Sequence, residues 1–493
     1  MLDVVELKKA CTGGAIKTEG KSSISFNDIR DSIVATVRDI RIKNSIDMDD
    51  YEPIVKATIE EFITSKQPLV TGYVDENDNI LTEGLKKDLE DAILGWGKLT
   101  CCRDDESIRE IQINGPAIFI DKGNKYQLLR DSNDVPVTFD SPEECFNFIT
   151  NALLFSGERL QVDECLVNGR TVEGYRIAAT HPIINPPSEE TPTIKWPTAL
   201  IRKIGHKFSE EDYINYKTAT QEMLDFFKAV GMAKLGFVVL GTTGCGKTTT
   251  MNFVVRNLPD NVRVGVIQKP TEIMYERRVD GYVVNNMFYW EASDKADPNS
   301  KGSSTVDNLV DHSLRYTADY LLLGEIRSSN EFASAARASN TGTDWMSTYH
   351  SFSVVAGLDR FALELQIALH IDFESAKVLA ARYMCIAVFQ DRLGDGSRRL
   401  MEVAEVIGYD IEKREYIINY LYKFVPTEVK YSKDGEAGVE GKFIKLNNIS
   451  NELKQKMLNR AVGDRYTKSF CYDFEKDENG ECVIEEILYP DYE

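Results

Sequence analysis

The sequence lacks any apolar run as long as a membrane-spanning helix, and its first residues lack the basic stretch and cleavage site of a secretory signal. It also lacks a C-x-x-C spacing, because its nine cysteines are scattered and only Cys101 and Cys102 stand close together. These absences argue against a zinc site and against a disulfide framework. They favour a chain that works in the reducing cytoplasm and has no transmembrane segment.

Positive charge is also scarce. The 493 residues include 79 acidic and 58 basic side chains, which gives a formal net charge of −21. This balance argues against a general nucleic-acid binder. Hydrophobic residues make up 42% and charged residues 28% of the chain, as in ordinary globular proteins, and the length allows two to four domains.

The most informative stretch reads G-T-T-G-C-G-K-T, from Gly241 to Thr248, and fits the phosphate-loop pattern G-x-x-x-x-G-K-[ST]. Glycines let successive backbone N–H groups turn toward an anion. Lys247 is expected to reach the β- and γ-phosphates, and the Thr248 hydroxyl to bind Mg²⁺. The apolar run 235–240 before the loop predicts a buried strand, and residues 249–257 after it can form a helix. The predicted nucleotide-binding residues are Gly241, Thr242, Thr243, Gly244, Cys245, Gly246, Lys247, Thr248 and Thr249.

A second stretch, Tyr320-Leu-Leu-Leu-Gly-Glu-Ile-Arg327, predicts a buried strand that ends in an acid. An acid opposite a phosphate loop can hold Mg²⁺ through water or activate the attacking water. Glu325 is therefore a predicted catalytic residue and, with Thr248, a predicted metal-binding residue. An acid that ends a strand without any role is the alternative interpretation.

Strands that alternate with helices behind a phosphate loop predict an α/β fold with a parallel, RecA-like ATPase core. Ser209-Glu-Glu-Asp212 is a capping pattern that predicts a helix running to about Val230. The predicted parts of the chain are a helical N-terminal extension (1–100), a smaller N-terminal α+β domain (101–182), a linker with a connecting helix (183–230), the RecA-like domain (231–425) and a C-terminal appendage (426–493).

A family resemblance rests on several further motifs. Asn340-Thr-Gly-Thr-Asp-Trp-Met-Ser-Thr-Tyr-His350 is similar to the His box of the secretion ATPase superfamily, whose members power type II and type IV secretion, pilus assembly and conjugation. Gly324-Glu-Ile-Arg327 resembles the Gly-Glu-Val-Arg element of that superfamily. Other matching motifs are Ile111-Gln-Ile-Asn-Gly-Pro116, Gly174-Tyr-Arg-Ile177, Leu200-Ile-Arg202 and Arg392-Leu-Gly-Asp-Gly-Ser-Arg-Arg399. The branch that the chain resembles most is that of the Flp/Tad-pilus assembly ATPases.

The resemblance implies ATP and Mg²⁺ as cofactors and a homohexameric ring. The ring would be cytoplasmic, peripheral at the inner face of the cell membrane, and bound to an inner-membrane platform or secretion-channel protein. No direct contact with nucleic acid is expected. Nucleotide would lie between the N-terminal and ATPase domains, where Arg176 and Arg202, with Arg170 nearby, would approach the phosphates. Arg327 is a predicted link between motifs.

Two departures from the family pattern affect the catalytic residues. The Asp box, usually Glu-Asp-Pro-x-Glu, reads Gln268-Lys-Pro-Thr-Glu272. Glu272 is kept and is a predicted catalytic acid, whereas Gln268 cannot take a proton, although a glutamine can orient a water. Thr343 replaces the first histidine of the His box. His350 remains, and a structural and a catalytic role are equally open for it.

Three functional hypotheses follow. The chain hydrolyses ATP as a secretion or pilus-assembly motor, with Glu325 or Glu272 as the acid. Alternatively, it is a nucleotide-binding but catalytically weak ring subunit of the same machinery, because Gln268 replaces the first acid of the Asp box. A nucleic-acid motor is the third hypothesis, and the net charge of −21 counts against it.

Overall fold

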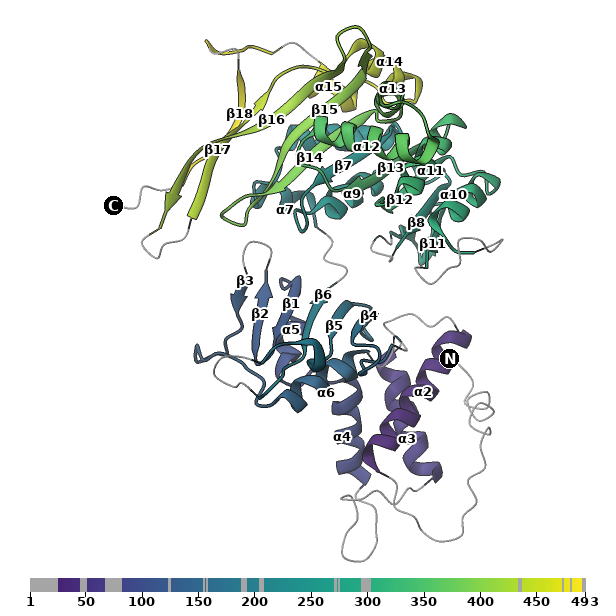
Figure 1. The fold of residues 1–493 in the computed structure, drawn as a ribbon, viewed down its shortest axis with the longest axis vertical. Coiled ribbons are helices and arrows are strands. Elements are labelled where there is room, and N and C mark those ends of the chain that lie inside the picture. The colour runs from purple at the N-terminus through teal and green to yellow at the C-terminus, as the bar shows by residue number, and fades with distance from the viewer. Residues whose placement is uncertain are drawn as a thin grey trace, which may run out of the picture. The chain divides into compact units, whose positions relative to one another are not determined.

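The computed structural model describes residues 25–44, 51–66, 82–122, 126–153, 156, 158–187, 193–203, 208–269, 273, 275–293, 303–432, 437–471, 474–478 and 481–489. The chain separates into two compact units, residues 1–206 and 207–493, and each is described by itself (Figure 1). Within the described ranges, we find no helix that is both long and apolar enough to cross a membrane.

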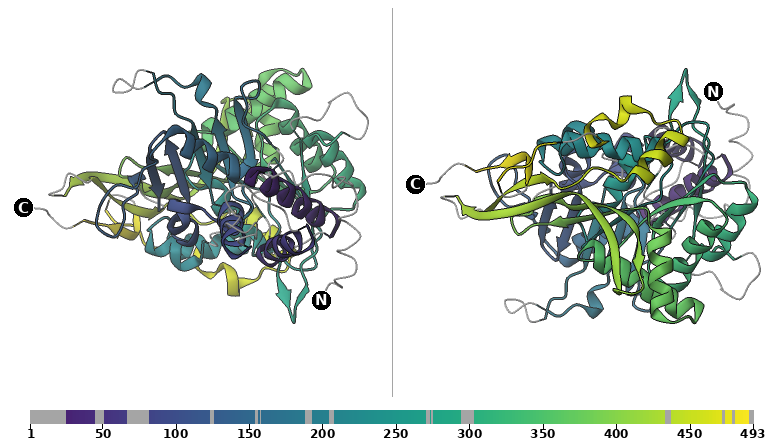
Figure 2. Two further views of the ribbon diagram at one scale, coloured as in Figure 1. Left: turned by 90° about the horizontal axis from the view of Figure 1, so that it is seen from below. Right: turned by 90° about the horizontal axis from the view of Figure 1, so that it is seen from above.

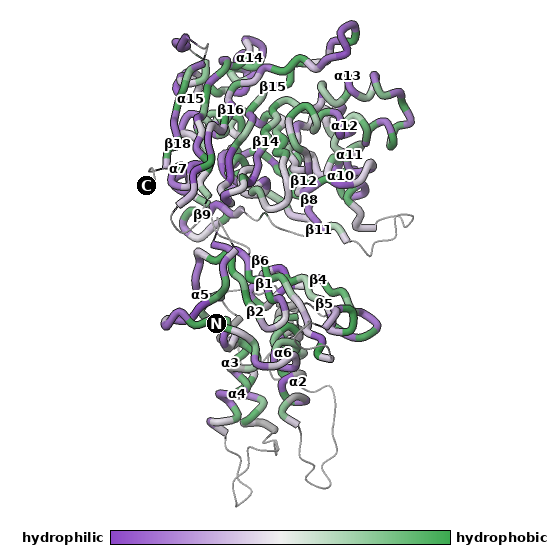
Figure 3. The backbone as a smooth tube through the Cα atoms, turned by 60° about the vertical axis from the view of Figure 1, so that its left-hand side comes forward, coloured by the Kyte–Doolittle hydropathy of each residue, from purple (hydrophilic) through white to green (hydrophobic). Residues whose placement is uncertain are grey.

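The first unit begins with three helices, α2 (Phe26–Asn44), α3 (Tyr51–Lys66) and α4 (Thr82–Leu94). Apolar residues recur in them every three or four positions, so each helix has one hydrophobic face. Figure 3 shows this as an alternation of green and purple along the helices. Side chains such as Ile33, Ile59 and Leu89 are fully buried in one cluster where these faces meet. The predicted helical N-terminal extension is confirmed.

A six-stranded antiparallel sheet makes up the rest of the first unit, in the order β3-β2-β1-β6-β5-β4. Alternate residues such as Ile111, Ile113 and Ile201 are buried together with Ile149 of a helix, and this alternation confirms the predicted α+β domain. The elements are η2 (Gly97–Leu99), α5 (Thr100–Asp104), β1 (Glu110–Asn114), β2 (Ala117–Asp121), β3 (Tyr126–Leu128), α6 (Pro142–Leu153), β4 (Leu166–Arg170), β5 (Arg176–Thr180), η3 (Pro182–Ile184) and β6 (Thr198–Arg202).

A ten-stranded sheet runs through the second unit, in the order β11-β8-β12-β13-β7-β14-β15-β16-β17-β18. The strands from β11 to β14 are parallel, and those from β14 to β18 are antiparallel. Their bounds are β7 (Phe237–Gly241), β8 (Val264–Gln268), β11 (Met287–Glu291), β12 (Tyr320–Glu325), β13 (Asp344–Tyr349), β14 (Ile386–Arg392), β15 (Arg398–Asp410), β16 (Glu415–Tyr431), β17 (Ala437–Lys445) and β18 (Cys482–Ile487). A separate ribbon pairs β9 (Arg278–Val279) with β10 (Tyr282–Val283).

Helices cover both faces of this sheet, because its central strands are apolar on both sides. Val239 of β7 and Leu322 of β12 belong to the core on one face, whereas their neighbours Leu240 and Leu323 belong to the core on the other. On the first face lie α8 (Gln221–Met232), α9 (Lys247–Val255), α14 (Asn451–Asn459) and α15 (Asp464–Cys471), preceded by α7 (Glu210–Asn215). On the second lie α10 (Val306–Arg315), α11 (Ser329–Asn340), α12 (Val354–Leu369) and α13 (Phe373–Tyr383). This three-layer arrangement confirms the predicted RecA-like α/β core.

The C-terminal strands continue the sheet of the α/β core. We call β15 to β18 with α14 and α15 the C-terminal extension; its strands lie side by side in both views of Figure 2. Strand β16 (Glu415–Tyr431) runs across residue 425, the predicted boundary of the appendage, and the predicted domain limits stay predictions. The Phe470 ring of α15 is 1% exposed and lies edge-on to the Phe226 ring of α8, 5.2 Å between centroids.

We predict that Phe470→Ala destabilises the core of the second unit. Removing a buried aromatic side chain typically lowers the free energy of unfolding by about 3–5 kcal/mol. Tyr466→Ala is the matched control, because Tyr466 lies on the same helix and is 43% exposed. Hydrogen exchange of β12 and β13 peptides in urea measures the effect on the full chain. Equal protection in both variants would mean that the extension folds independently of the core.

Candidate functional site

The predicted site residues of the second unit converge on one edge of its sheet. Strands β7, β8, β12 and β13 run parallel, so their carboxyl ends share that edge. They end at Gly241, Gln268, Glu325 and Tyr349, and His350 follows directly. Segments separated by more than a hundred residues in the sequence thus meet at the position where open α/β sheets bind ligands.

The phosphate loop begins at the last residue of β7 and runs into the first turn of α9, so strand, loop and helix occur in the predicted order. Three glycines are required by its backbone. Gly244 and Gly246 have φ 73° and 100°, which side-chain-bearing residues rarely adopt, and a Cβ atom at Gly241 would overlap the carbonyl oxygen of Gln390. Cys245 is fully buried under the loop, whereas Thr243 and Gly244 are exposed. Thr248 and Thr249 are half-buried in the first turn of α9.

Lys247 lies over the phosphate loop with only 8% of the residue exposed. Its Nζ donates hydrogen bonds to the carbonyl oxygens of Thr242, at 2.8 Å, and Gly241, at 3.2 Å. The same Nζ is 3.4 Å from Nδ1 of His350. The ammonium group is therefore held at the loop, where an anion bound by the backbone N–H groups would meet it.

His350 connects Lys247 to the predicted acid. Its Nε2 lies 3.0 Å from Oε1 of Glu325, and its Nδ1 lies 3.2 Å from the carbonyl oxygen of Gly241. On the other side of the acid, the Arg327 guanidinium donates to Glu325 Oε2 at 2.7 Å. Lys247, His350, Glu325 and Arg327, all predicted from sequence, thus form one continuous chain of contacts.

The charges of this chain shift two pKa values downward. Burial alone would raise the pKa of Glu325, but the hydrogen bond and charge of Arg327, with the charges of His350 and Lys247, lower it below its ordinary value. Burial and the charge of Lys247 lower the pKa of His350, although the Glu325 carboxylate opposes this. At neutral pH Glu325 is therefore a carboxylate and His350 is a neutral imidazole.

The residues at the carboxyl edge fit a hydrated Mg²⁺ ion. Oε1 of Glu325 is buried and makes no aligned hydrogen bond in the described structure, its 3.0 Å contact with His350 being off-axis. Such an acceptor suits a water bound to the metal. Thr248 supplies a hydroxyl at the N-terminus of α9, the usual direct ligand in a phosphate-loop site. Oxygen ligands of these kinds are what Mg²⁺ prefers.

Gln268 is held by the backbone of the segment that follows it. The residue is 2% exposed; its Nε2 donates to the Ile273 carbonyl oxygen at 2.8 Å, and its Oε1 accepts from the Ile273 N–H at 2.7 Å. Both ends of the amide are engaged in this way, which argues against the sequence interpretation that Gln268 orients a water. The other Asp-box residue, Glu272, lies outside the described residues.

The predicted arginines of the first unit form a row across three strands. Arg170 of β4 pairs with Arg176 of β5, and Arg176 pairs with Arg202 of β6. Arg202 lies opposite Glu110 of β1, to which its Nε donates at 2.7 Å. Because directly paired residues share a face of the sheet, the three guanidinium groups concentrate positive charge at one place.

Three further residues contact the phosphate loop and were not predicted as site residues. Gln390 accepts from Thr250 Oγ1 at 2.7 Å, Asp391 accepts from Thr242 Oγ1 at 2.7 Å, and Arg398 donates to the Gly244 carbonyl oxygen at 2.9 Å. For Arg398 the signal in the sequence was the R-L-G-D-G-S-R-R stretch, which carries a family resemblance, whereas Gln390 and Asp391 lie just before that stretch. Only the pairing of β14 with β7 brings it to the loop.

Part of the chain is similar in sequence to proteins of secretion and competence systems. Residues 156–381 match the family described as "Type II/IV secretion system protein". The chain is 30% identical over 132 residues to competence protein ComGA of Streptococcus pneumoniae, covering 27% of this chain and 37% of that one. It is 24% identical over 161 residues to the type IV secretion system protein VirB11 of Bartonella quintana, covering 32% and 43%. The chain therefore spans less than half the length of these two relatives.

Among solved structures, the Legionella pneumophila ATPase DotB is similar, with 15% identity, a TM-score of 0.41 and coverage of 78% of this chain and 86% of that one. The family match includes the phosphate loop, the strand that ends in Glu325 and the His350 segment. These are the motifs that carried the resemblance in the sequence, and the structure brings them together at one edge. Through residues 156–381, a little under half of its length, the chain is therefore similar to the type II/IV secretion system proteins.

Proposed function

We propose that the chain is an ATP-hydrolysing motor of a secretion, conjugation or pilus-assembly machine. Its working form is a homohexameric ring at the cytoplasmic face of the inner membrane, where it binds a platform or secretion-channel protein. The Flp/Tad branch is the nearest in motif pattern. The observation that carries this proposal is the contact chain from Lys247 through His350 and Glu325 to Arg327 beside the phosphate loop.

In this proposal the loop N–H groups and Lys247 bind the β- and γ-phosphates of ATP. Mg²⁺, when bound, neutralises phosphate charge and orients the γ-phosphate. Glu325 is ionised at neutral pH, so its carboxylate can accept the proton of an attacking water. Arg327 holds that carboxylate in one orientation, and the neutral His350 ring fixes the distance between the carboxylate and Lys247. Glu272 is the second candidate for the acid.

The arginine row of the first unit is proposed to serve the same nucleotide. Guanidinium groups on three adjacent strands suit the several oxygens of a phosphate chain. An arginine brought to a transferring phosphoryl group can accelerate the reaction by about 10³–10⁵-fold. Arg176 and Arg202 are the residues proposed for this contact.

The alternative proposal is a nucleotide-binding ring subunit that turns over ATP weakly. One observation favours it: the position of the first Asp-box acid holds Gln268, whose amide is bound to the backbone of Ile273. In that case the ring would act through its nucleotide-bound conformation. The two proposals share the binding residues and differ in whether the water is activated.

We predict that the purified chain hydrolyses ATP in the presence of Mg²⁺ and that Lys247→Ala lowers turnover by about 10²–10³-fold. Loss of a charge aimed at the phosphates removes electrostatic stabilisation of this size. Lys413→Ala, a change at an exposed turn lysine, is the control. Steady-state phosphate release measures both. Turnover that persists in Lys247→Ala would contradict the assignment of the phosphate loop.

We predict that Glu325→Gln lowers turnover by roughly 10²–10⁴-fold while ATP affinity changes only a few-fold. The amide keeps the shape of the side chain but cannot accept the proton. Glu415→Gln, on the exposed start of β16, is the control, and Glu272→Gln is measured in parallel. Single-turnover hydrolysis and a fluorescent-nucleotide titration separate the chemical step from binding. Wild-type turnover in Glu325→Gln, with a loss in Glu272→Gln, would transfer the role to Glu272.

We predict that Gln268→Glu does not raise turnover and lowers the free energy of unfolding by about 1–3 kcal/mol. The new carboxylate would lose the donor that reaches the Ile273 carbonyl and would leave that oxygen facing another acceptor. Gln455→Glu, the same change on α14, is the control. Turnover and urea unfolding are measured on the full chain. A tenfold or larger gain in turnover would instead support the weak-subunit alternative.

A further inference from the structure

The turn between β14 and β15, residues 393–397, lies beside the phosphate loop. Asp391, near the end of β14, accepts a hydrogen bond from Thr242 of the loop, and Gln390 accepts one from Thr250 of α9, just after the loop. Arg398, just after it, donates from Nε to the carbonyl oxygen of Gly244 at 2.9 Å. The facing ends of β14 and β15 thus hold the loop at Thr242 and Gly244, and they hold the helix that follows it at Thr250.

The same turn is held on its other side by the C-terminal extension. Asp395 is 7% exposed; its Oδ1 accepts from the Ser397 N–H at 2.9 Å and from Ser397 Oγ at 2.6 Å. Its Oδ2 accepts from the Val439 N–H of β17 at 2.9 Å. The pairing of β17 with β18 begins only at Gly441, so at Val439 the Asp395 carboxylate occupies the edge that β18 leaves open. One side chain therefore fixes both the shape of the turn and its distance from β17.

Arg399, the residue after Arg398, strengthens this connection. It is 1% exposed, and its guanidinium donates to the carbonyl oxygen of Tyr216 at 3.1 Å. The guanidinium carbon also lies 5.8 Å from the centre of the Phe424 ring of β16. A buried guanidinium needs such partners to offset its loss of hydration. The turn is therefore joined to β16 as well as to β17.

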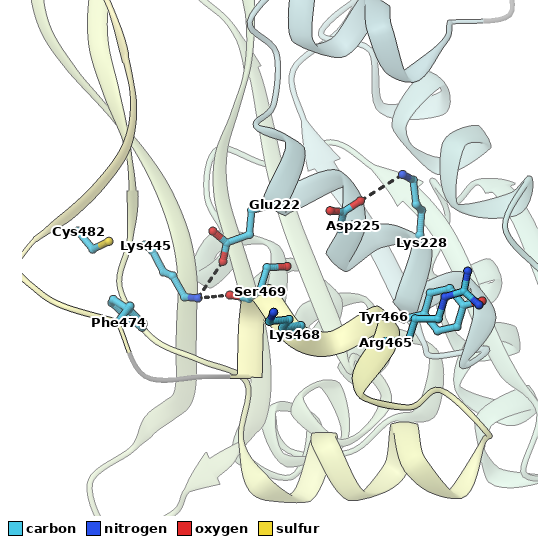
Figure 4. Close-up of a pocket in the computed structure, with 10 residues that line it drawn as sticks. All are labelled: Glu222, Asp225, Lys228, Lys445, Arg465, Tyr466, Lys468, Ser469, Phe474 and Cys482. Atoms are coloured by element: carbon cyan, nitrogen blue, oxygen red, sulfur yellow. Dashed lines mark hydrogen bonds and ion pairs between the residues drawn. The ribbon is translucent and has the colours of Figure 1, made fainter.

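The extension is itself fastened to the core that carries the phosphate loop. Figure 4 shows Lys445 of β17 reaching Glu222 of α8 and the backbone of Ser469 on α15. Its Nζ lies 2.8 Å from Glu222 Oε1 and 2.5 Å from the Ser469 carbonyl oxygen, and the side chain is 4% exposed. Tyr422 of β16 donates to the same Glu222 oxygen at 2.9 Å. The contacts with Glu222 therefore hold the extension against α8. Any displacement of β17 that does occur would move the turn between β14 and β15 through Asp395.

Residues 382–493, which include this turn and the whole extension, lie outside the segment that matches the secretion-system family. We propose that the C-terminal extension sets the nucleotide affinity of the phosphate loop, with Arg398 as the positioning residue and Asp395 as its connection to β17. This inference rests on the proposed function of the loop. Arg398 acts on the loop backbone at Gly244, one of its two exposed positions.

The physical reason is that an anion-binding loop must keep its N–H groups aimed at one point. Gly244 has φ 73° and is exposed, and apart from its chain neighbours no atom lies within 4 Å of where a Cβ would be, so no side chain packs against that side of it. The hydrogen bond from Arg398 supplies a restraint there. A loop held in its binding conformation pays less ordering entropy when the phosphates arrive, so its affinity is higher. A displacement of β17 acts on Arg398 through Asp395.

The test measures the affinity of the full chain for a fluorescent ADP analogue with Mg²⁺. We expect Arg398→Ala to weaken binding roughly threefold to tenfold, the typical effect of losing one such hydrogen bond, and Arg398→Lys to restore it only in part. Asp395→Asn leaves one acceptor oxygen for the Ser397 and Val439 N–H groups, so one of the two contacts is lost, and the change is expected to weaken binding by a similar factor. Arg465→Ala on α15 and Asp410→Asn, which changes another turn-capping aspartate of β15, are the matched controls.

The double variant Asp395→Asn/Arg398→Ala separates positioning from general destabilisation. If Asp395 acts through Arg398, the double variant binds no more weakly than Arg398→Ala alone. Wild-type affinity in Arg398→Ala, or losses that multiply in the double variant, would overturn the proposal. Absence of binding in the wild-type chain would instead refute the proposed function of the loop, so the two failures are distinguishable. Because Arg398 is only half-buried, its variant tests the proposal even if Asp395→Asn unfolds.

Discussion

The second unit depends on one constraint: the backbone of the phosphate loop must turn its N–H groups toward a single point. That requires glycines at positions that no side chain tolerates, and it requires neighbours on all sides, because a glycine-rich backbone is otherwise costly to order. Strand β7 meets this need because it is fully buried between β13 and β14. The buried Lys247 and the contact of Gly241 with Gln390 then fix the start of the loop.

The electrostatics at the carboxyl edge follow from the same arrangement. Parallel strands bring Glu325 and His350 to one place, where burial alone would neutralise the acid and make it a poor base. Arg327 prevents this, since its charge and hydrogen bond outweigh the cost of burial and lower the pKa of Glu325. Lys247 likewise lowers the pKa of His350, where it acts together with burial and helps to keep that ring neutral. The edge therefore holds one carboxylate and one neutral imidazole between two cations.

The sequence was sufficient to predict the position of a residue where the neighbouring residues of the chain determine that position. The phosphate loop, the acid at the end of β12 and His350 after β13 each follow an apolar run, so parallel pairing alone predicts that they meet. Sequence failed where tertiary contacts decide. The predicted helix from Ser209 to Val230 is two helices, α7 and α8, because the chain turns at Lys217, with φ 53°, and Thr220 caps a new helix. The Ser209–Asp212 capping box that begins α7 is present as predicted.

Gln268 illustrates the limit most clearly. The sequence alone suggests that a glutamine at the position of the first Asp-box acid weakens catalysis. In the structure the same amide joins the end of β8 to the backbone of Ile273, a task that needs a donor and an acceptor and that a carboxylate performs badly. The substitution therefore has a structural explanation within the segment itself. If the chain hydrolyses ATP, a carboxylate elsewhere must accept the proton of the attacking water. Glu325 is a carboxylate whose surroundings keep it ionised.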